Sequence, residues 1–228
     1  MGYLNSKLAR EVSRLTGWSG KIWERRYQAI PVSEEEAAQV ARLRYLLAHG
    51  CKEDLVARVS DWPGVHCSHA FSEGKPLSGY WFDRTQECLA RRRGEDLEPL
   101  RYATPESVTL SPLPCWQDLS WEVYRLRVAE LVQASEESAA AERKRAGTQV
   151  LGSAAIRAQH PYTRPRRSKR SIAPRFHAAT REVRRRLYDA YAMFVAAYRA
   201  AAEKLRAGDP APPFPAGCFP PPLPFVSG

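Results

Sequence analysis

Hydrophobic residues recur every three or four positions over long parts of this chain, with polar residues between them. This is the spacing of a helix that buries one face. Long amphipathic helices are therefore predicted over residues 3–15, 34–48, 118–146 and 180–207. The same pattern predicts shorter helices over residues 51–61, 65–71, 84–93 and 148–159.

Particular residue types mark where these helices begin and end. Ser33 and Glu36 form an S-x-x-E capping box, and Gly50 is expected to end the helix that they start. Asp118 is the expected N-cap of the third long helix, whose charged end over residues 136–147 is expected to be solvated. Gly208 is expected to end the last one.

Extended segments are fewer than helices. Aromatic and β-branched residues over Lys21–Val32 predict an edge strand, and further extended pieces are expected at residues 79–82 and 107–110. His160–Phe176 contains three prolines and no helical period, which predicts an extended basic loop. The chain is therefore expected to adopt an α+β fold that is mostly helical.

These boundaries divide the chain into four segments: residues 1–63, 64–117, 118–208 and 209–228. The second is expected to be an irregular linker subdomain and the third a helical extension. The last is rich in proline and is expected to be extended. It could dock on the rest of the chain through Phe214, Phe219 and Phe225.

Composition narrows the class of protein. Hydrophobic residues make up 44% of the chain and charged residues 26%, which is typical of soluble globular proteins. There is no apolar run long enough for a membrane span and no signal-peptide pattern, so no membrane partner is expected. The five cysteines form no C-x-x-C pair, which favours reduced thiols in the cytoplasm over disulfides or a zinc site.

Positive charge is concentrated in one part of the chain. The net charge is +10, and residues 164–186 contribute +9 of it, from ten basic residues and one glutamate. Such a concentration indicates an element that binds a polyanion, although arginines on one face of a helix can also be merely solvated. The candidate nucleic-acid contacts in this region are Arg164, Arg166, Arg167, Lys169, Arg170, Arg175, Arg184 and Arg185.

Arg25 and Arg26 are a second candidate contact, since they lie beside Trp23 and Tyr27. Interleaved arginines and aromatic residues suit phosphate contact together with base stacking. A strand with one solvated face explains the same pattern equally well.

The stretch LRYLLAHG places a tyrosine and a histidine four residues apart on one helix. Val40, Leu43 and Leu47 fall together on a helical wheel, and Tyr45 and His49 lie on the other side. Lys52 would join them if the helix continued for another turn. Spacing alone also fits an amphipathic tyrosine and a histidine near a helix C-terminus.

Five motifs follow one another in and around this stretch: Trp23–Tyr27, Val32–Glu35, Tyr45–Gly50, Asp54–Val56 and Asp61–Pro63. Their order and spacing resemble the REP-associated tyrosine transposases, a branch of the single-tyrosine HUH insertion-sequence transposases of bacterial mobile elements. The downstream stretches SGYWFDRT, RRSKRSIAPRFH and CFPPPLPFV resemble a subgroup with a long C-terminal region.

The resemblance implies a fold and a chemistry. Residues 1–63 would be the C-terminal part of a ferredoxin-like transposase domain, with the tyrosine helix and one strand, and residues 164–186 would be a basic loop and helix in the extension. Tyr45 would attack a phosphodiester of single-stranded or hairpin DNA and form a 5′-phosphotyrosine. Through this intermediate the protein would cleave a DNA strand and rejoin it. His49 would help to hold a divalent metal, Mg²⁺ or Mn²⁺.

Two departures from the family pattern change what is expected of this chain. The family takes its main metal ligands from a His-hydrophobe-His motif before the tyrosine, and the five histidines here form no such pair. The early strands are also missing, so the chain is expected to be truncated at its N-terminus and incomplete as an enzyme. It could act as a homodimer or pair with a full-length copy. The alternative is a DNA-binding remnant without catalysis, or an unstable fragment.

Overall fold

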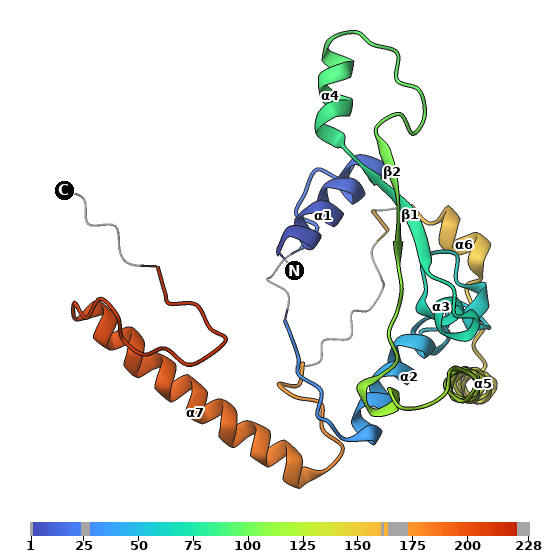
Figure 1. Cartoon of the computed structure of the whole chain (residues 1–228). Helices are drawn as coiled ribbons and strands as arrows, with labels where there is room; N and C mark the ends of the chain where they lie inside the picture. The colour runs from blue at the N-terminus through green and yellow to red at the C-terminus, as the bar shows by residue number, and fades with distance from the viewer. Residues whose placement is uncertain (1, 24–27, 161, 164–172, 223–228) are drawn as a thin grey trace. The chain divides into compact units, whose positions relative to one another are not determined.

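The computed structural model describes residues 2–23, 28–160, 162–163 and 173–222, and within them the fold is α+β and mostly helical (Figure 1). None of the described helices is long and apolar enough to cross a membrane. The α-helices are α1 (Gly2–Thr16), α2 (Glu36–Lys52), α3 (Cys67–Glu73), α4 (Arg84–Arg92), α5 (Trp121–Ala146), α6 (Ser153–Ala158) and α7 (Arg181–Arg206).

The chain forms two compact units. Unit 1 contains Met1–Tyr27 and Gln39–Lys169, and unit 2 contains Gln28–Ala38 and Arg170–Gly228. Each unit includes residues from more than one of the four segments expected from the sequence.

Tyr124 of α5 is at the centre of the core of unit 1. It is fully buried and contacts the rings of Phe71 at 5.8 Å, Trp116 at 5.8 Å and Trp121 at 5.4 Å between centroids. Leu43 and Leu47 of α2 and Val128 of α5 complete the cluster of buried side chains. Burial of each large apolar side chain contributes about 1.5–3 kcal/mol, so this cluster holds α2, α3 and α5 together.

Helix α2 continues through Gly50 to Lys52, so the prediction that Gly50 ends it was wrong. Packing against this position is tight: a Cβ there would lie 3.0 Å from Val56 Cγ2 and 3.2 Å from Trp62 Cε3. The N–H groups of Leu55 and Val56 donate to the Gly50 carbonyl, at 3.0 and 3.3 Å. The motifs after the tyrosine helix therefore fold back onto its last turn.

Two predicted caps were also wrong. The Ser33 hydroxyl donates to the Glu35 carboxylate at 2.7 Å instead of capping a backbone N–H, and α2 begins only at Glu36. At α5 the cap is Ser120, which accepts from the Val123 N–H at 3.4 Å, rather than Asp118. The predicted helix over residues 51–61 is reduced to a short 3₁₀ turn, η1 (Val59–Asp61).

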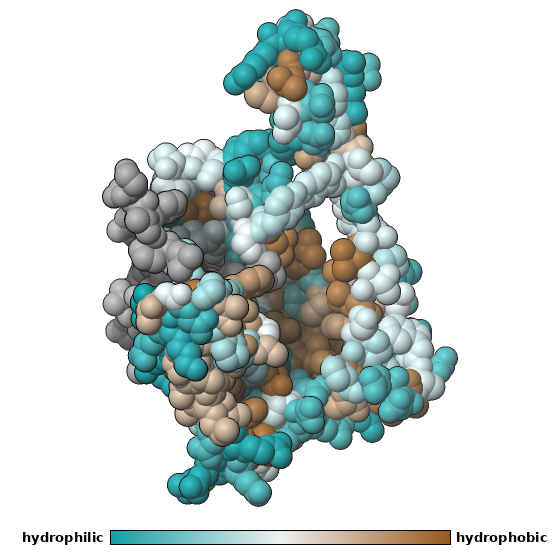
Figure 2. Space-filling view, turned by 60° about the vertical axis from the view of Figure 1, so that its left-hand side comes forward, coloured by the Kyte–Doolittle hydropathy of each residue, from teal (hydrophilic) through white to brown (hydrophobic). Residues whose placement is uncertain are grey.

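The sheet consists of two antiparallel strands, β1 (Leu77–Phe82) and β2 (Ala103–Val108), with Tyr80 opposite Pro105. Helix α4 lies in the connection between them, at the end of the ribbon, and its lobe at the top of Figure 2 is mostly hydrophilic. The strand expected near residues 79–82 is confirmed. The strand expected over Lys21–Val32 is not: its described residues form one isolated bridge, from Val32 to His177.

In unit 2, Glu35 binds the residues before α7. Its carboxylate accepts from the N–H groups of Ala179 at 2.8 Å and Thr180 at 3.1 Å, and from the Thr180 hydroxyl at 2.7 Å. Hydrogen bonds from Ser33 and Thr180 lower the pKa of Glu35 to about 2. Thr180 also caps α7 by accepting from the Val183 N–H.

The proline-rich tail docks on α7 through some of its expected contacts. The Phe214 ring contacts the Tyr198 ring edge-on at 5.4 Å, as predicted. The Tyr198 hydroxyl donates to the Phe219 carbonyl at 3.3 Å, but the Phe219 side chain is 90% exposed. Phe225 lies outside the described residues.

Candidate nucleic-acid interface

Helix α2 presents Tyr45 on the side opposite its buried face, as the sequence predicts. Leu43 and Leu47 are 3% and 1% exposed, whereas Tyr45 is 43% exposed. The core contacts of the two leucines fix the rotation of the helix. Tyr45 is therefore held at the surface by packing on the far side of α2.

Charged and aromatic side chains surround the Tyr45 ring. The His49 ring lies 5.6 Å away between centroids, tilted by 49°, so the predicted pairing of the two rings is confirmed. The Arg42 guanidinium carbon lies 5.4 Å and the Lys52 Nζ 5.5 Å from the Tyr45 ring centroid. Lys52 can reach the ring because α2 continues past Gly50.

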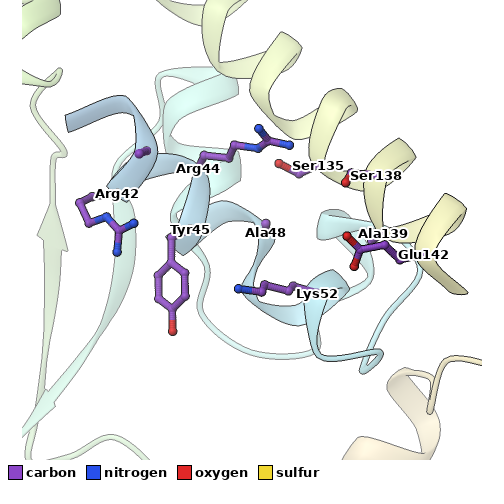
Figure 3. Close-up of a pocket in the computed structure, with 10 residues that line it drawn as sticks. Arg42, Arg44, Tyr45, Ala48, Lys52, Ser135, Ser138, Ala139 and Glu142 are labelled. Carbon is purple, nitrogen blue, oxygen red and sulfur yellow. The ribbon is translucent and has the colours of Figure 1, made fainter. Parts of the chain in front are cut away.

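Tyr45, Arg42 and Lys52 border a pocket of about 280 Å³ between α2 and α5 (Figure 3). Tyr45 projects from α2 with Arg42 and Lys52 on either side, and Arg44 points toward α5. The lining contains three cations, Arg42, Arg44 and Lys52, and one carboxylate, Glu142, so its net charge is +2. Such a pocket suits a singly charged anion such as a phosphodiester.

The sequence pattern did not indicate the α5 side of the pocket: most of residues 136–147 are exposed, as expected, but not all of them. Ala139 is instead 7% exposed, and Arg143 donates to the Cys51 carbonyl at 3.2 Å. Small residues form part of this side, namely Ser135, Ser138 and Ala139. A run of small residues on one face of a charged helix was the only available signal.

The residues around His49 do not fit a divalent cation. Among the described residues, no group of three or more His, Cys, Asp or Glu side chains is placed to hold a metal ion. The charged groups at the neighbouring Tyr45 ring are both cations, which would repel one.

His66 and His69 have structural contacts in and beside α3. His66 Nδ1 accepts from the Ser68 N–H at 3.2 Å and so caps α3. Burial lowers the pKa of His66, which keeps Nδ1 available as an acceptor. His69 lies 3.4 Å from the Glu73 carboxylate.

Three of the predicted DNA contacts lie in the described part of unit 2. Arg184 donates to the Ala178 carbonyl at 3.3 Å, Arg185 lies 4.0 Å from Asp189, and the Arg175 guanidinium lies 5.6 Å from the Tyr191 ring centroid. Outside the described residues lie Arg25, Arg26, Arg164, Arg166, Arg167, Lys169 and Arg170.

Comparison of the whole chain with protein-family models, with curated proteins and with solved structures gives no match.

Proposed function

We propose that this protein binds single-stranded DNA and that one phosphodiester sits in the pocket beside Tyr45. The placement of Arg42 and Lys52 on either side of an exposed tyrosine is the observation that carries the proposal. Two cations can contact the non-bridging oxygens of a phosphate, while the phenol ring offers a face for a neighbouring base.

The sequence supports the same function independently. The ordered motifs around Tyr45 resemble those of REP-associated tyrosine transposases, which act on hairpin DNA. The charge of +9 over residues 164–186 provides a second region suited to phosphate contacts. In the proposal, this is a protein of transposase type with a partial ferredoxin-like domain.

The proposed role of the isolated chain is binding without cleavage. In the family reaction, the Tyr45 hydroxyl would attack phosphorus and displace the 3′ oxygen of the leaving strand. A phenol is a poor nucleophile at neutral pH, and the two cations would offset only part of the charge that develops on the phosphoryl oxygens. The proposal agrees with the described residues, among which no group of three or more His, Cys, Asp or Glu side chains is placed to hold a metal ion.

Charge-matched variants test the binding site. Arg42→Gln/Lys52→Gln removes two cations from the pocket. Lys144→Gln/Arg145→Gln removes the same charge from the exposed last turn of α5 and is the control. Fluorescence anisotropy with a hairpin that carries a single-stranded arm gives log Kobs against log salt. Loss of the one phosphate contact that these cations share should reduce the magnitude of the slope by about 0.7 for the pocket variant.

Equal effects of the two variants would contradict binding at Tyr45. Cleavage is tested separately on denaturing gels with Mg²⁺ or Mn²⁺. We expect no covalent adduct with the chain alone. An adduct that Tyr45→Phe abolishes would show that the chain cleaves DNA unaided and would refute binding without cleavage.

A further inference from the structure

A second basic surface lies in unit 1, between α1 and α4, at the end of the ribbon. Arg84 of α4 holds the two helices together: its Nε and one terminal nitrogen each donate to the Glu11 carboxylate of α1 at 2.9 Å. Its other terminal nitrogen donates to Glu87. The hydrogen bond from Arg84 lowers the pKa of Glu11, as expected for a carboxylate in a bidentate pair.

The cleft between these helices has a volume of about 510 Å³ and a cationic lining. Its two carboxylates, Glu11 and Glu87, are both already bound by Arg84. Six cations against two carboxylates leave a net charge of +4. The six are Lys7, Arg10, Arg14, Arg84, Arg91 and Arg92.

Three of these cations, Lys7, Arg10 and Arg92, have no carboxylate partner among the residues that the structure describes. Arg10 on α1 and Arg92 on α4 are exposed and make no ion pair there. An anion in the cleft could therefore bind these two guanidinium groups without breaking an existing ion pair. Arg guanidinium groups contact phosphate oxygens in a bidentate manner, which makes a phosphate the best match.

Exposed aromatic rings adjoin the cleft. Tyr3 of α1 stacks on Trp81 of β1 at 6.3 Å between centroids, with their planes 26° apart. Lys7, which also lines the cleft, lies 5.4 Å from the Tyr3 ring and 5.1 Å from the Trp81 ring. Tyr3 is 68% exposed and Trp81 43% exposed, so both rings keep surface available for another planar group.

We infer that the α1–α4 cleft and the Tyr3–Trp81 pair form a second binding surface for single-stranded nucleic acid, with phosphates at Arg10 and Arg92 and a base on the rings. Aromatic faces beside unpaired arginines are the combination that such strands use. The surface extends the proposed function, but its contacts are separate from those of the Tyr45 pocket.

An anionic membrane is the competing partner, because α1 also exposes Leu4 and Leu8. The cations favour a strand: half of them come from α4, so they line a concave cleft between two helices and not only the polar face of one amphipathic helix. The lobe that contains α4 is mostly hydrophilic (Figure 2). A narrow polyanion fits this arrangement better than a lipid surface.

Binding of the full chain to labelled oligodeoxythymidine tests the inference. Arg10→Gln/Arg92→Gln should reduce the magnitude of the salt slope by about 1.4, relative to the Lys144→Gln/Arg145→Gln control. Trp81→Leu keeps an apolar side chain but removes the stacking face, and should weaken binding about five- to hundredfold. Circular dichroism checks that each variant is folded.

The outcomes separate this inference from the proposed function. Wild-type affinity and slope in the Arg10→Gln/Arg92→Gln variant would overturn the inference and leave the Tyr45 pocket untouched. An effect of this variant together with none of Arg42→Gln/Lys52→Gln would support the cleft and refute the pocket. If Arg10→Gln/Arg92→Gln abolishes pelleting with phosphatidylserine vesicles while DNA binding is unchanged, the surface is a membrane site and the inference fails.

Discussion

The contact between Gly74 and Trp121 predicts a large cost for a single added methyl group. Gly74 ends α3 in the left-handed region, at φ 69°, and a Cβ there would lie 2.7 Å from Trp121 Nε1. Trp121 in turn stacks on Tyr124, the fully buried centre of the core. Gly74→Ala must therefore both strain the backbone and displace an indole ring that packs against the core.

The variant Gly94→Ala separates the cost of backbone strain from the cost of displacing the Trp121 ring. It has a similar backbone conformation, φ +74°, but a Cβ there would meet no atom within 4 Å. Gly94→Ala should lose only the conformational preference, about 1–2 kcal/mol. Gly74→Ala should lose this and a further 1–3 kcal/mol, roughly, for overpacking against Trp121.

Urea unfolding followed by tryptophan fluorescence measures the difference. All six tryptophans lie within residues 18–121, so the signal reports on unit 1 and not on unit 2. We expect the unfolding midpoint of Gly74→Ala to lie clearly below that of Gly94→Ala. Equal midpoints would refute the packing of Trp121 against the end of α3.

Two further predictions concern α2 and Glu35. Leu47→Ala should destabilise unit 1 by about 2–5 kcal/mol, because Leu47 is buried in the core. Leu46→Ala is the control: Leu46 is 58% exposed, so the free energy of unfolding should change by less than about 1 kcal/mol. Equal losses of stability in urea unfolding would contradict the orientation of α2. The Glu35 pKa is lowered from 4.5 to about 2, so its contacts should stabilise unit 2 above pH 4.5 and be lost as the pH falls toward 2. An NMR titration should show this, and Glu35→Gln should remove the dependence; a Glu35 pKa near 4.5 would contradict the contacts.

The face that α2 presents could be predicted from the sequence because it depends on local periodicity. Leu43 and Leu47 recur at helical spacing, and this placed Tyr45 and His49 together on the opposite side. The end of the helix could not be predicted in this way. Glycine often ends a helix, but Trp62 packs against Gly50 and the helix continues to Lys52.

The α5 side of the pocket depends on tertiary contacts that a periodic sequence pattern does not specify. Ser138 and Glu142 belong to a helix end with high charge, which indicates solvation when it is considered alone. Their place opposite Tyr45 follows from Tyr124 and Val128, which fix α5 against α2. Over its described residues, the strand expected before α2 is reduced to the bridge from Val32 to His177, since a strand forms only where a partner completes its hydrogen bonds.

Mapping of the bound strand on the protein tests the central claim most directly. Single-stranded DNA should be titrated into the isotopically labelled chain, with backbone amide shifts recorded by NMR. We predict that the largest shifts include residues 42–52 of α2 and residues 135–142 of α5, the two sides of the pocket. Binding that leaves both segments unshifted would contradict a phosphodiester site at Tyr45.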